Sequence, residues 1–138
     1  SRIGECDIFV ACAAVADYRC DGVSDQKIKK SQDSLELSLV RNPDILRQVA
    51  TSKSPPYTVG FAAETERVAE QADEKRRSKS VDMIAANLVG GDLGGFGSDV
   101  NALTVLWDEG EVKLPMMKKM QLAQELVSLI AREYHEKN

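Results

Sequence analysis

The sequence predicts an α/β fold, with a Rossmann-like and mainly parallel sheet flanked by helices and a β-hairpin and a helix at the C-terminus. Short apolar runs alternate with longer segments of helical periodicity, and continuous apolar runs are typical of strands covered on both faces. The composition, 43% hydrophobic and 29% charged, is that of a globular chain. At 138 residues we expect one domain, 1–138, with one core.

The first half of the chain contains two predicted strands and a helix. The apolar run 6–18 predicts a strand buried on both faces, whereas 34–41 alternates leucines with polar residues and predicts a half-exposed strand. A helix is predicted over 42–53. Its start is marked by a capping side chain, a residue suited to the first helical position and a carboxylate that complements the helix dipole: Asn42, Pro43 and Asp44.

The second half repeats the strand and helix alternation. Apolar runs at 57–64 and 81–89 predict two more buried strands, joined by a helix over 65–80. A hairpin over 101–115 is predicted to turn at Asp108–Gly110. The last helix, 117–137, is predicted to bury an apolar face made of Ala123, Leu126, Val127, Ile130 and Tyr134.

Charge and cysteine content exclude several classes of protein. A net charge of −4 disfavours a general nucleic-acid or membrane-surface binder, and no apolar run approaches the roughly 20 residues of a membrane span. No signal peptide opens the chain, so we expect a cytoplasmic protein. Cys6, Cys12 and Cys20 are expected to be reduced and mostly buried. The one histidine, His135, lies in a polar tail, which disfavours thiol catalysis.

Metal binding by the chain itself is not expected, because no cluster of histidine, cysteine and carboxylate residues has the spacing of metal ligands. A Mg²⁺ ion carried by a nucleotide remains compatible with the sequence. The glycine-rich stretch 90–99 lacks the spacing of the known phosphate loops and is interpreted as a mobile loop, with a lid as one role open to it.

A candidate ligand site follows from where polar residues meet the ends of strands. In α/β sheets ligands bind beyond the carboxyl ends of the strands, where Asp17, 42–45, 61–64 and Asn87 are expected to lie. The alternative is that Asp17 and Asn42 only turn the chain and cap a helix. For Asn42 the capping role is favoured, and for Asp17 the two interpretations are equal.

Two groups of lysines add positive charge to this acidic chain. Lys27, Lys29 and Lys30 follow the first apolar run, where a phosphate-bearing ligand would need neutralising. Lys75 and Lys79 are four residues apart and share a helix face. The competing interpretation is a solvated lysine run in the first case, and an exposed helix end in the second.

Six sequence blocks, taken together, resemble one known family: ACAAVADYR, QKIKKS, LVRNPDIL, VGFAAET, KRRSKSVDMIAAN and GFGSDVNALTVLW. The family is the phosphopantothenate–cysteine ligase (phosphopantothenoylcysteine synthetase) domain of the bacterial bifunctional coenzyme A biosynthesis flavoprotein. The resemblance begins near Asp7 and reaches the C-terminus. The family's glycine-rich N-terminal segment and its flavin-dependent decarboxylase domain have no counterpart here, so we expect the C-terminal, nucleotide-binding portion of the ligase.

The resemblance implies a CTP-dependent acid–amino-acid ligase of coenzyme A biosynthesis. It would join 4′-phosphopantothenate to cysteine through an acyl-cytidylate, with Mg²⁺, and Lys27 matches the family's essential lysine. Asp17 would contact either the base or the ribose. The implied CTP contacts are Ala11, Cys12, Ala13, Asp17, Lys27, Asn42, Pro43, Asp44, Ile45, Phe61, Lys75 and Lys79.

We also expect a homodimer, because a sheet that lacks its first strand would expose an unpaired edge and an apolar face. The resemblance implies fusion to, or a complex with, a flavin-dependent decarboxylase, and the net charge of −4 disfavours nucleic-acid and membrane partners. Two other functions remain open. One is a nucleotide-binding or dimerising fragment without full activity. The other is a nicotinamide-binding Rossmann reductase, which the absence of the glycine fingerprint disfavours.

Overall fold

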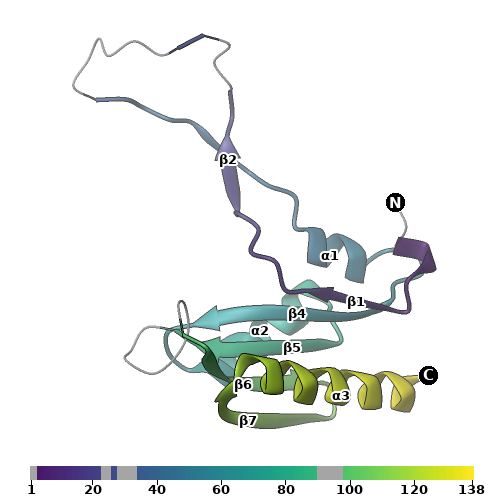
Figure 1. The fold of residues 1–138 in the computed structure, drawn as a ribbon. Helices are drawn as coiled ribbons and strands as arrows, with labels where there is room; N and C mark the ends of the chain where they lie inside the picture. The colour runs from purple at the N-terminus through teal and green to yellow at the C-terminus, as the bar shows by residue number, and fades with distance from the viewer. Residues whose placement is uncertain (1–2, 23–25, 28–33, 90–97) are drawn as a thin grey trace.

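The computed structural model describes residues 3–22, 26–27, 34–89 and 98–138, and it has the predicted α/β architecture. A five-stranded sheet in the order β1-β4-β5-β6-β7 forms the middle layer. Helix α2 covers one face and helix α3 the other, so that the sheet lies between them (Figure 1). The strands of this sheet are β1 (Ile8–Ala11), β4 (Tyr57–Glu64), β5 (Met83–Leu88), β6 (Val100–Trp107) and β7 (Gly110–Lys118).

The sheet is mixed, as predicted. β1, β4 and β5 run parallel, while β5, β6 and β7 pair antiparallel. The hairpin between β6 and β7 turns at Asp108 and Glu109, which confirms the turn expected from the sequence. Parallel strands carry their carboxyl ends to one edge, so Ala11, Glu64 and Leu88 end β1, β4 and β5 at the same side of the sheet.

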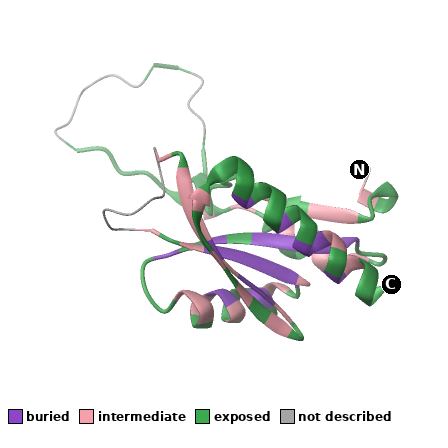
Figure 2. Cartoon of the chain, turned by 60° about the horizontal axis from the view of Figure 1, so that its bottom comes forward, coloured by how far each residue is buried: buried purple, intermediate pink, exposed green. Residues whose placement is uncertain are grey.

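The core lies on both faces of the central strands, which are purple in Figure 2. On one face, Val59, Met83 and Val105 pack against α3 (Lys119–Lys137); on the other, Ile84 and Ala86 pack with the α2 residue Ala72. Helix α2 spans Val68–Lys79, inside the predicted range.

The buried face predicted for the last helix was partly wrong. Helix α3 begins at Lys119, because β7 continues to Lys118, and it buries Leu122, Leu126, Leu129 and Ile130. Val127 is 64% exposed, and Ala123 is exposed as well. Apolar residues occupy two adjoining faces of this helix. The predicted set therefore mixed residues of the buried face, such as Leu126, with residues of the exposed face, such as Val127.

The strand predicted over 6–18 is shorter and less buried than expected. β1 has four residues, and it lies at the edge of the sheet where β4 is the strand paired with it. Val10 is 41% exposed, and Cys6, Cys12 and Cys20 are all exposed thiols, which corrects the expectation of buried cysteines. An edge strand has one fewer neighbour to cover it than a central one, so its apolar composition did not imply burial.

The end of the run enters an arm that the sequence analysis did not predict. β2 (Tyr18–Cys20) pairs antiparallel with β3 (Leu39–Arg41), and this two-stranded arm projects away from the sheet (Figure 1). Cys20 is the last residue of β2. The strand predicted over 34–41 is shorter in the structure, where only Leu39–Arg41 form a strand.

The helix that follows the arm is short and starts later than predicted. Helix α1 spans Ile45–Ala50, and its cap is Asp44, whose carboxylate accepts a hydrogen bond from the Arg47 N–H at 3.1 Å. Asn42 and Pro43 therefore precede the helix and do not start it. α1 packs closely on β4 at Gly60, where a Cβ atom would lie 2.8 Å from Leu46 Cδ2.

Candidate functional site

The carboxyl edge of the sheet gathers most of the residues expected to form the site. Phe61 and Glu64 lie in the last half of β4, and Asn87 is paired with Ala63 next to them. Asp44 and Ile45 start α1. Phe61 is 39% exposed and Ile45 is 51% exposed, so an apolar group could be contacted at this edge.

Helix α2 brings two lysines to carboxylates at the rim of this edge. Lys75 Nζ lies 2.7 Å from Glu64 Oε1, and Lys79 Nζ lies 3.0 Å from Asp44 Oδ2. The spacing of four residues puts both ammonium groups on one side of the helix, as the sequence indicated. The two ion pairs join α2 to the end of β4 and to the start of α1.

The local charge keeps Asp44 ionised. Burial acts to raise the pKa of this carboxyl group, but the hydrogen bond from the Arg47 N–H and the Lys79 ammonium outweigh it. The resulting pKa lies below the ordinary value of 3.8. Asp44 therefore caps α1 and also forms an ion pair with Lys79. The sequence indicated a role for Asp44 at the helix start and a contact with CTP, but it did not indicate the ion pair.

Asn42 fastens the base of the arm. Its backbone N–H donates to the Asp17 carbonyl at 2.8 Å, and its side-chain amide donates to the Ala16 carbonyl at 2.7 Å. Arg19 in turn donates to Asn42 Oδ1 at 3.0 Å. The capping role favoured for Asn42 was wrong, because its hydrogen bonds go across the arm and not into α1.

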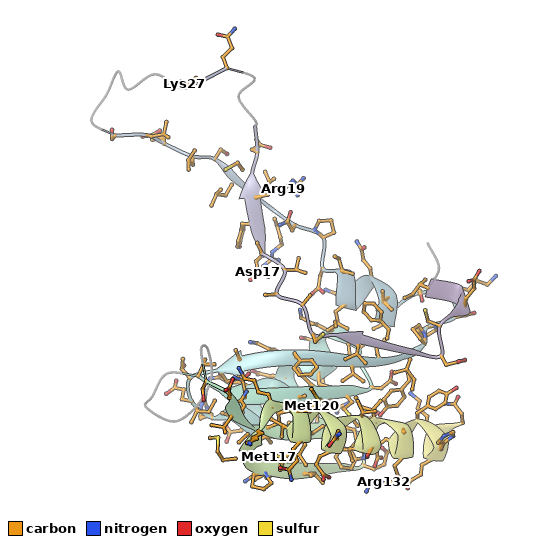
Figure 3. All side chains as sticks on the ribbon, in the orientation of Figure 1. Asp17, Arg19, Lys27, Met117, Met120 and Arg132 are labelled. Carbon is orange, nitrogen blue, oxygen red and sulfur yellow. The ribbon has the colours of Figure 1, made fainter. Side chains whose placement is uncertain are left out.

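Asp17 and Ala11–Ala13 lie where the chain passes from the sheet into the arm. Ala11 ends β1, and Cys12 and Ala13 are exposed in the connection that follows. Asp17 is exposed at the base of the arm, and Figure 3 places it between the sheet and Arg19. The connection thus leads from the end of β1 away from the sheet and into the arm (Figure 1).

Lys27 lies far from the other candidates. It is exposed at the outer end of the arm, well away from the sheet (Figure 3). A single chain therefore does not bring Lys27 together with Lys75 and Lys79. Lys29, Lys30 and the loop 90–97 fall outside the described residues.

Two cavities in the described part of the chain lie at the opposite edge of the sheet. They have volumes of about 650 and 580 Å³ and share Tyr57, Asp82 and Lys137 in their walls. None of the residues predicted to contact CTP lines either one.

Comparison with known proteins identifies the family. Residues 1–134 match the family described as the DNA/pantothenate metabolism flavoprotein C-terminal domain. The chain belongs to this family. A 136-residue alignment with the coenzyme A biosynthesis bifunctional protein CoaBC of Escherichia coli shows 48% identity and covers 96% of this chain. The protein of the same name from Bacillus subtilis is 38% identical over 126 residues, which cover 91% of this chain.

The match covers only part of each relative. The chain spans about a third of the curated relatives, 34% of the Escherichia coli protein and 31% of the Bacillus subtilis protein. A crystal structure of the C-terminal domain of CoaBC superposes with a TM-score of 0.75 at 29% identity, covering 98% of this chain and 58% of that one. The flavoprotein from Streptococcus pneumoniae has the same fold, with a TM-score of 0.71 at 19% identity.

Two further properties concern metals and membranes. Within residues 3–22, 26–27, 34–89 and 98–138, no three histidine, cysteine or carboxylate side chains are grouped to hold a metal ion. In the same part of the chain, no helix has the length and apolar character needed to cross a membrane.

Sequence reasoning missed the partners of the two lysines. The run VGFAAE placed Glu64 at the end of a strand, and the spacing of Lys75 and Lys79 placed them on one helix face. Which carboxylate each lysine reaches depends on how α2 packs across the sheet. No sequence signal specifies that packing.

Proposed function

We propose that this chain is the nucleotide-binding part of a CTP-dependent phosphopantothenate–cysteine ligase of coenzyme A biosynthesis. The observation that carries the proposal is the pair of α2 lysines, Lys75 and Lys79, at the carboxyl edge of a parallel sheet beside the N-terminus of α1. This is the edge at which α/β sheets bind ligands. The family and the relatives named CoaBC support the pathway.

The reaction proceeds in two transfers. The carboxylate of 4′-phosphopantothenate attacks the α-phosphorus of CTP, and the bond to the departing pyrophosphate breaks. The cysteine amine then attacks the acyl carbon, which forms the amide, loses a proton and releases CMP. Because the first step brings an anion to an anion, the protein contributes mainly positioning and charge neutralisation.

The residues of this chain have distinct tasks in that scheme. Lys75 and Lys79 offset charge on the triphosphate, and Lys27 stabilises the negative charge that develops during acyl-cytidylate formation. Phe61 and Ile45 supply apolar contact, and Asp17 accepts a hydrogen bond from the nucleotide. The remaining contacts proposed for CTP are Ala11, Cys12, Ala13, Asn42, Pro43 and Asp44.

The Mg²⁺ ion is proposed to arrive with the nucleotide, held by its phosphates. Asp44 and Glu64, the carboxylates beside the two lysines, are both in ion pairs and do not fit a magnesium site formed by the protein. Mg²⁺ commonly retains waters and few protein ligands when it accompanies a nucleotide. The exposed thiols of the chain suit the reducing cytoplasm, where we place the reaction.

We further propose that the chain works as a homodimer. Large apolar side chains are exposed along the arm and the connection that leads to it: Val15, Tyr18, Leu35, Leu37 and Leu39. Exposed apolar groups on one continuous element mark an interaction surface. A second copy that covers this arm would also bring protein toward the candidate site. In the complete protein, a flavin-dependent decarboxylase domain is proposed to accompany the ligase.

The proposal is tested by thermal shifts of the complete protein with CTP, ATP and NADPH, followed by an assay of pyrophosphate release. A ligand that binds only the folded state raises the melting temperature, and the stabilisation grows with the logarithm of the ligand concentration divided by the dissociation constant. We expect CTP to stabilise most, and pyrophosphate release to require 4′-phosphopantothenate. Stabilisation by NADPH alone would favour the reductase interpretation, and CTP binding without product would favour a binding module.

A further inference from the structure

Glu64 is a buried carboxylate at the edge of the candidate site. It is the last residue of β4, its carbonyl accepts the Val89 N–H at 2.8 Å, and its side chain is 6% exposed. A carboxylate removed from water is costly unless a cation compensates it. Lys75 supplies that cation, with its Nζ 2.7 Å from Glu64 Oε1.

Lys75 faces two environments. Its side chain is 48% exposed, so the ammonium group reaches the buried carboxylate while part of the side chain stays in contact with solvent. An ammonium group has three hydrogen-bond donors. The contact with Glu64 is an ion pair, because Glu64 Oε1 accepts no hydrogen bond from the described residues. The donors of the ammonium group are therefore available to the oxygens of a phosphate.

The other lysine is held differently. Lys79 and Asp44 have side chains that are 36% and 40% exposed, so water can replace either partner at little cost. If Lys75 left Glu64, by contrast, the carboxylate would stay buried without its cation, which is strongly unfavourable. An incoming triphosphate therefore cannot draw Lys75 away from Glu64, although it can draw Lys79 away from Asp44.

We propose that Glu64 is a positioning residue for nucleotide binding, which acts by holding Lys75 Nζ at the carboxyl edge of the sheet. Lys75 then meets the phosphates without a change of rotamer, and the entropy of fixing a long side chain is lost on folding and not on binding. This inference rests on the function proposed above, because it assigns Lys75 to the triphosphate.

The test is a double-mutant cycle in the complete protein, with the dissociation constant for CTP measured by calorimetry. Glu64→Gln keeps the shape and removes the charge, Lys75→Met removes the ammonium group, and the third variant carries both changes. We expect each single change to weaken CTP binding about tenfold, the amount expected for one charged hydrogen bond. Because Glu64 acts through Lys75, the double variant should bind no more weakly than Lys75→Met alone.

Melting temperatures separate positioning from simple stabilisation. Lys75→Met leaves a buried carboxylate without its cation and should lower the melting temperature, and adding Glu64→Gln should restore it without restoring CTP binding. Glu70→Gln is the matched control: Glu70 is an exposed residue of α2 whose carboxylate lies 3.3 Å from Arg67 Nη1. We expect this control to leave both CTP affinity and melting temperature unchanged.

Three results would overturn the inference: unchanged CTP affinity in Glu64→Gln, additive losses in the double variant, or tighter binding in Glu64→Gln. The last result would make Glu64 a competitor of the triphosphate. Failure of the wild-type protein to bind CTP would instead refute the proposed function, and the inference with it. Normal wild-type binding with any of the three results refutes the inference alone.

Discussion

Lys79 Nζ lies 3.0 Å from the carboxylate of Asp44, which also caps α1 through a hydrogen bond from the Arg47 N–H. One carboxylate thus joins α2 to α1 and satisfies the start of a helix. These two contacts lower the pKa of Asp44 below 3.8, although burial alone would raise it. Protonation of Asp44 should therefore weaken both contacts together.

The first prediction concerns acid stability. A carboxyl group whose pKa is lower in the folded state stabilises the fold at pH values above its unfolded pKa, and that contribution is lost as the pH falls through the folded pKa. We expect Asp44→Asn, which can still cap the helix, to reduce the loss of stability below about pH 4. Urea unfolding at pH 3 and at pH 7 would show a smaller difference for the variant, and an equal difference would contradict the assignment.

The second prediction concerns Asp82, which lies outside the candidate site. Its carboxylate accepts hydrogen bonds from Thr58 N at 2.6 Å and Thr58 Oγ1 at 2.8 Å, and it is paired with Lys137 near the end of α3. Burial acts to raise the pKa of Asp82, but Lys137 and Thr58 hold it below 3.8. Asp82→Ala leaves the buried Thr58 N–H without this acceptor, so we expect a loss of about 1–3 kcal/mol in unfolding free energy.

Denaturant unfolding at pH 7 measures this loss. Glu111→Ala is a suitable control, because Glu111 is at the surface of β7 and lies 3.8 Å from the exposed Lys113. Changes at such surface positions usually stay within about 0.5 kcal/mol. Equal effects of the two substitutions would show that the Asp82 network does not stabilise the fold.

The third prediction concerns the contact between α1 and β4. A Cβ atom at Gly60 would lie 2.8 Å from Leu46 Cδ2, so Gly60→Ala must displace the leucine or the helix. We expect a loss of about 1 kcal/mol, the low end of the cost of inserting a group into a packed core, because the displaced atom is the tip of a half-buried leucine side chain. In a Leu46→Ala background the same change should cost much less, because the clashing methyl group is absent. Gly22→Ala, which meets no atom within 4 Å, is the control.

The sequence predicted the sheet more reliably than the site. β4 and β5 were recognised because both lie in the middle of the sheet, where burial on both faces leaves a continuous apolar run. β1 has the same type of sequence but lies at an edge, and β2 was missed because a three-residue exposed strand has no apolar signal. Helical spacing was enough to place Lys75 and Lys79 on one face of α2. Their ion-pair partners, Glu64 and Asp44, could not be predicted, because these pairs form only through tertiary packing.

The fourth prediction concerns the nucleotide contact proposed for Asp17. This residue is exposed at the base of the arm, and its backbone carbonyl accepts the Asn42 N–H at 2.8 Å. Since Asp17→Asn leaves the backbone intact, we expect the fold to be unchanged and CTP binding to weaken by about 1.5–3 kcal/mol, the value of a hydrogen bond to a charged group. Calorimetry with equal CTP affinity before and after the change would remove Asp17 from the site.

The last prediction concerns Lys27, which lies at the outer end of the arm, far from the sheet (Figure 3) and from helix α2, which carries Lys75 and Lys79. Because Lys27 is exposed, Lys27→Gln should leave the melting temperature unchanged, but we expect it to abolish acyl-cytidylate formation in the complete protein. The apolar arm is proposed to lie on a second copy, so Lys27 would serve the site of its partner. If so, a Lys27→Gln chain mixed with a Lys75→Met chain should form heterodimers with one intact site. In an assay with CTP far below saturation, Lys27→Gln alone should be inactive and Lys75→Met alone should retain about a tenth of wild-type activity. Recovery of about a quarter of wild-type pyrophosphate release is expected, since half of the dimers in an equal mixture are hybrids and each hybrid has one of two sites intact. No recovery after confirmed exchange of chains would show that Lys27 reaches the site of its own chain by movement of the arm.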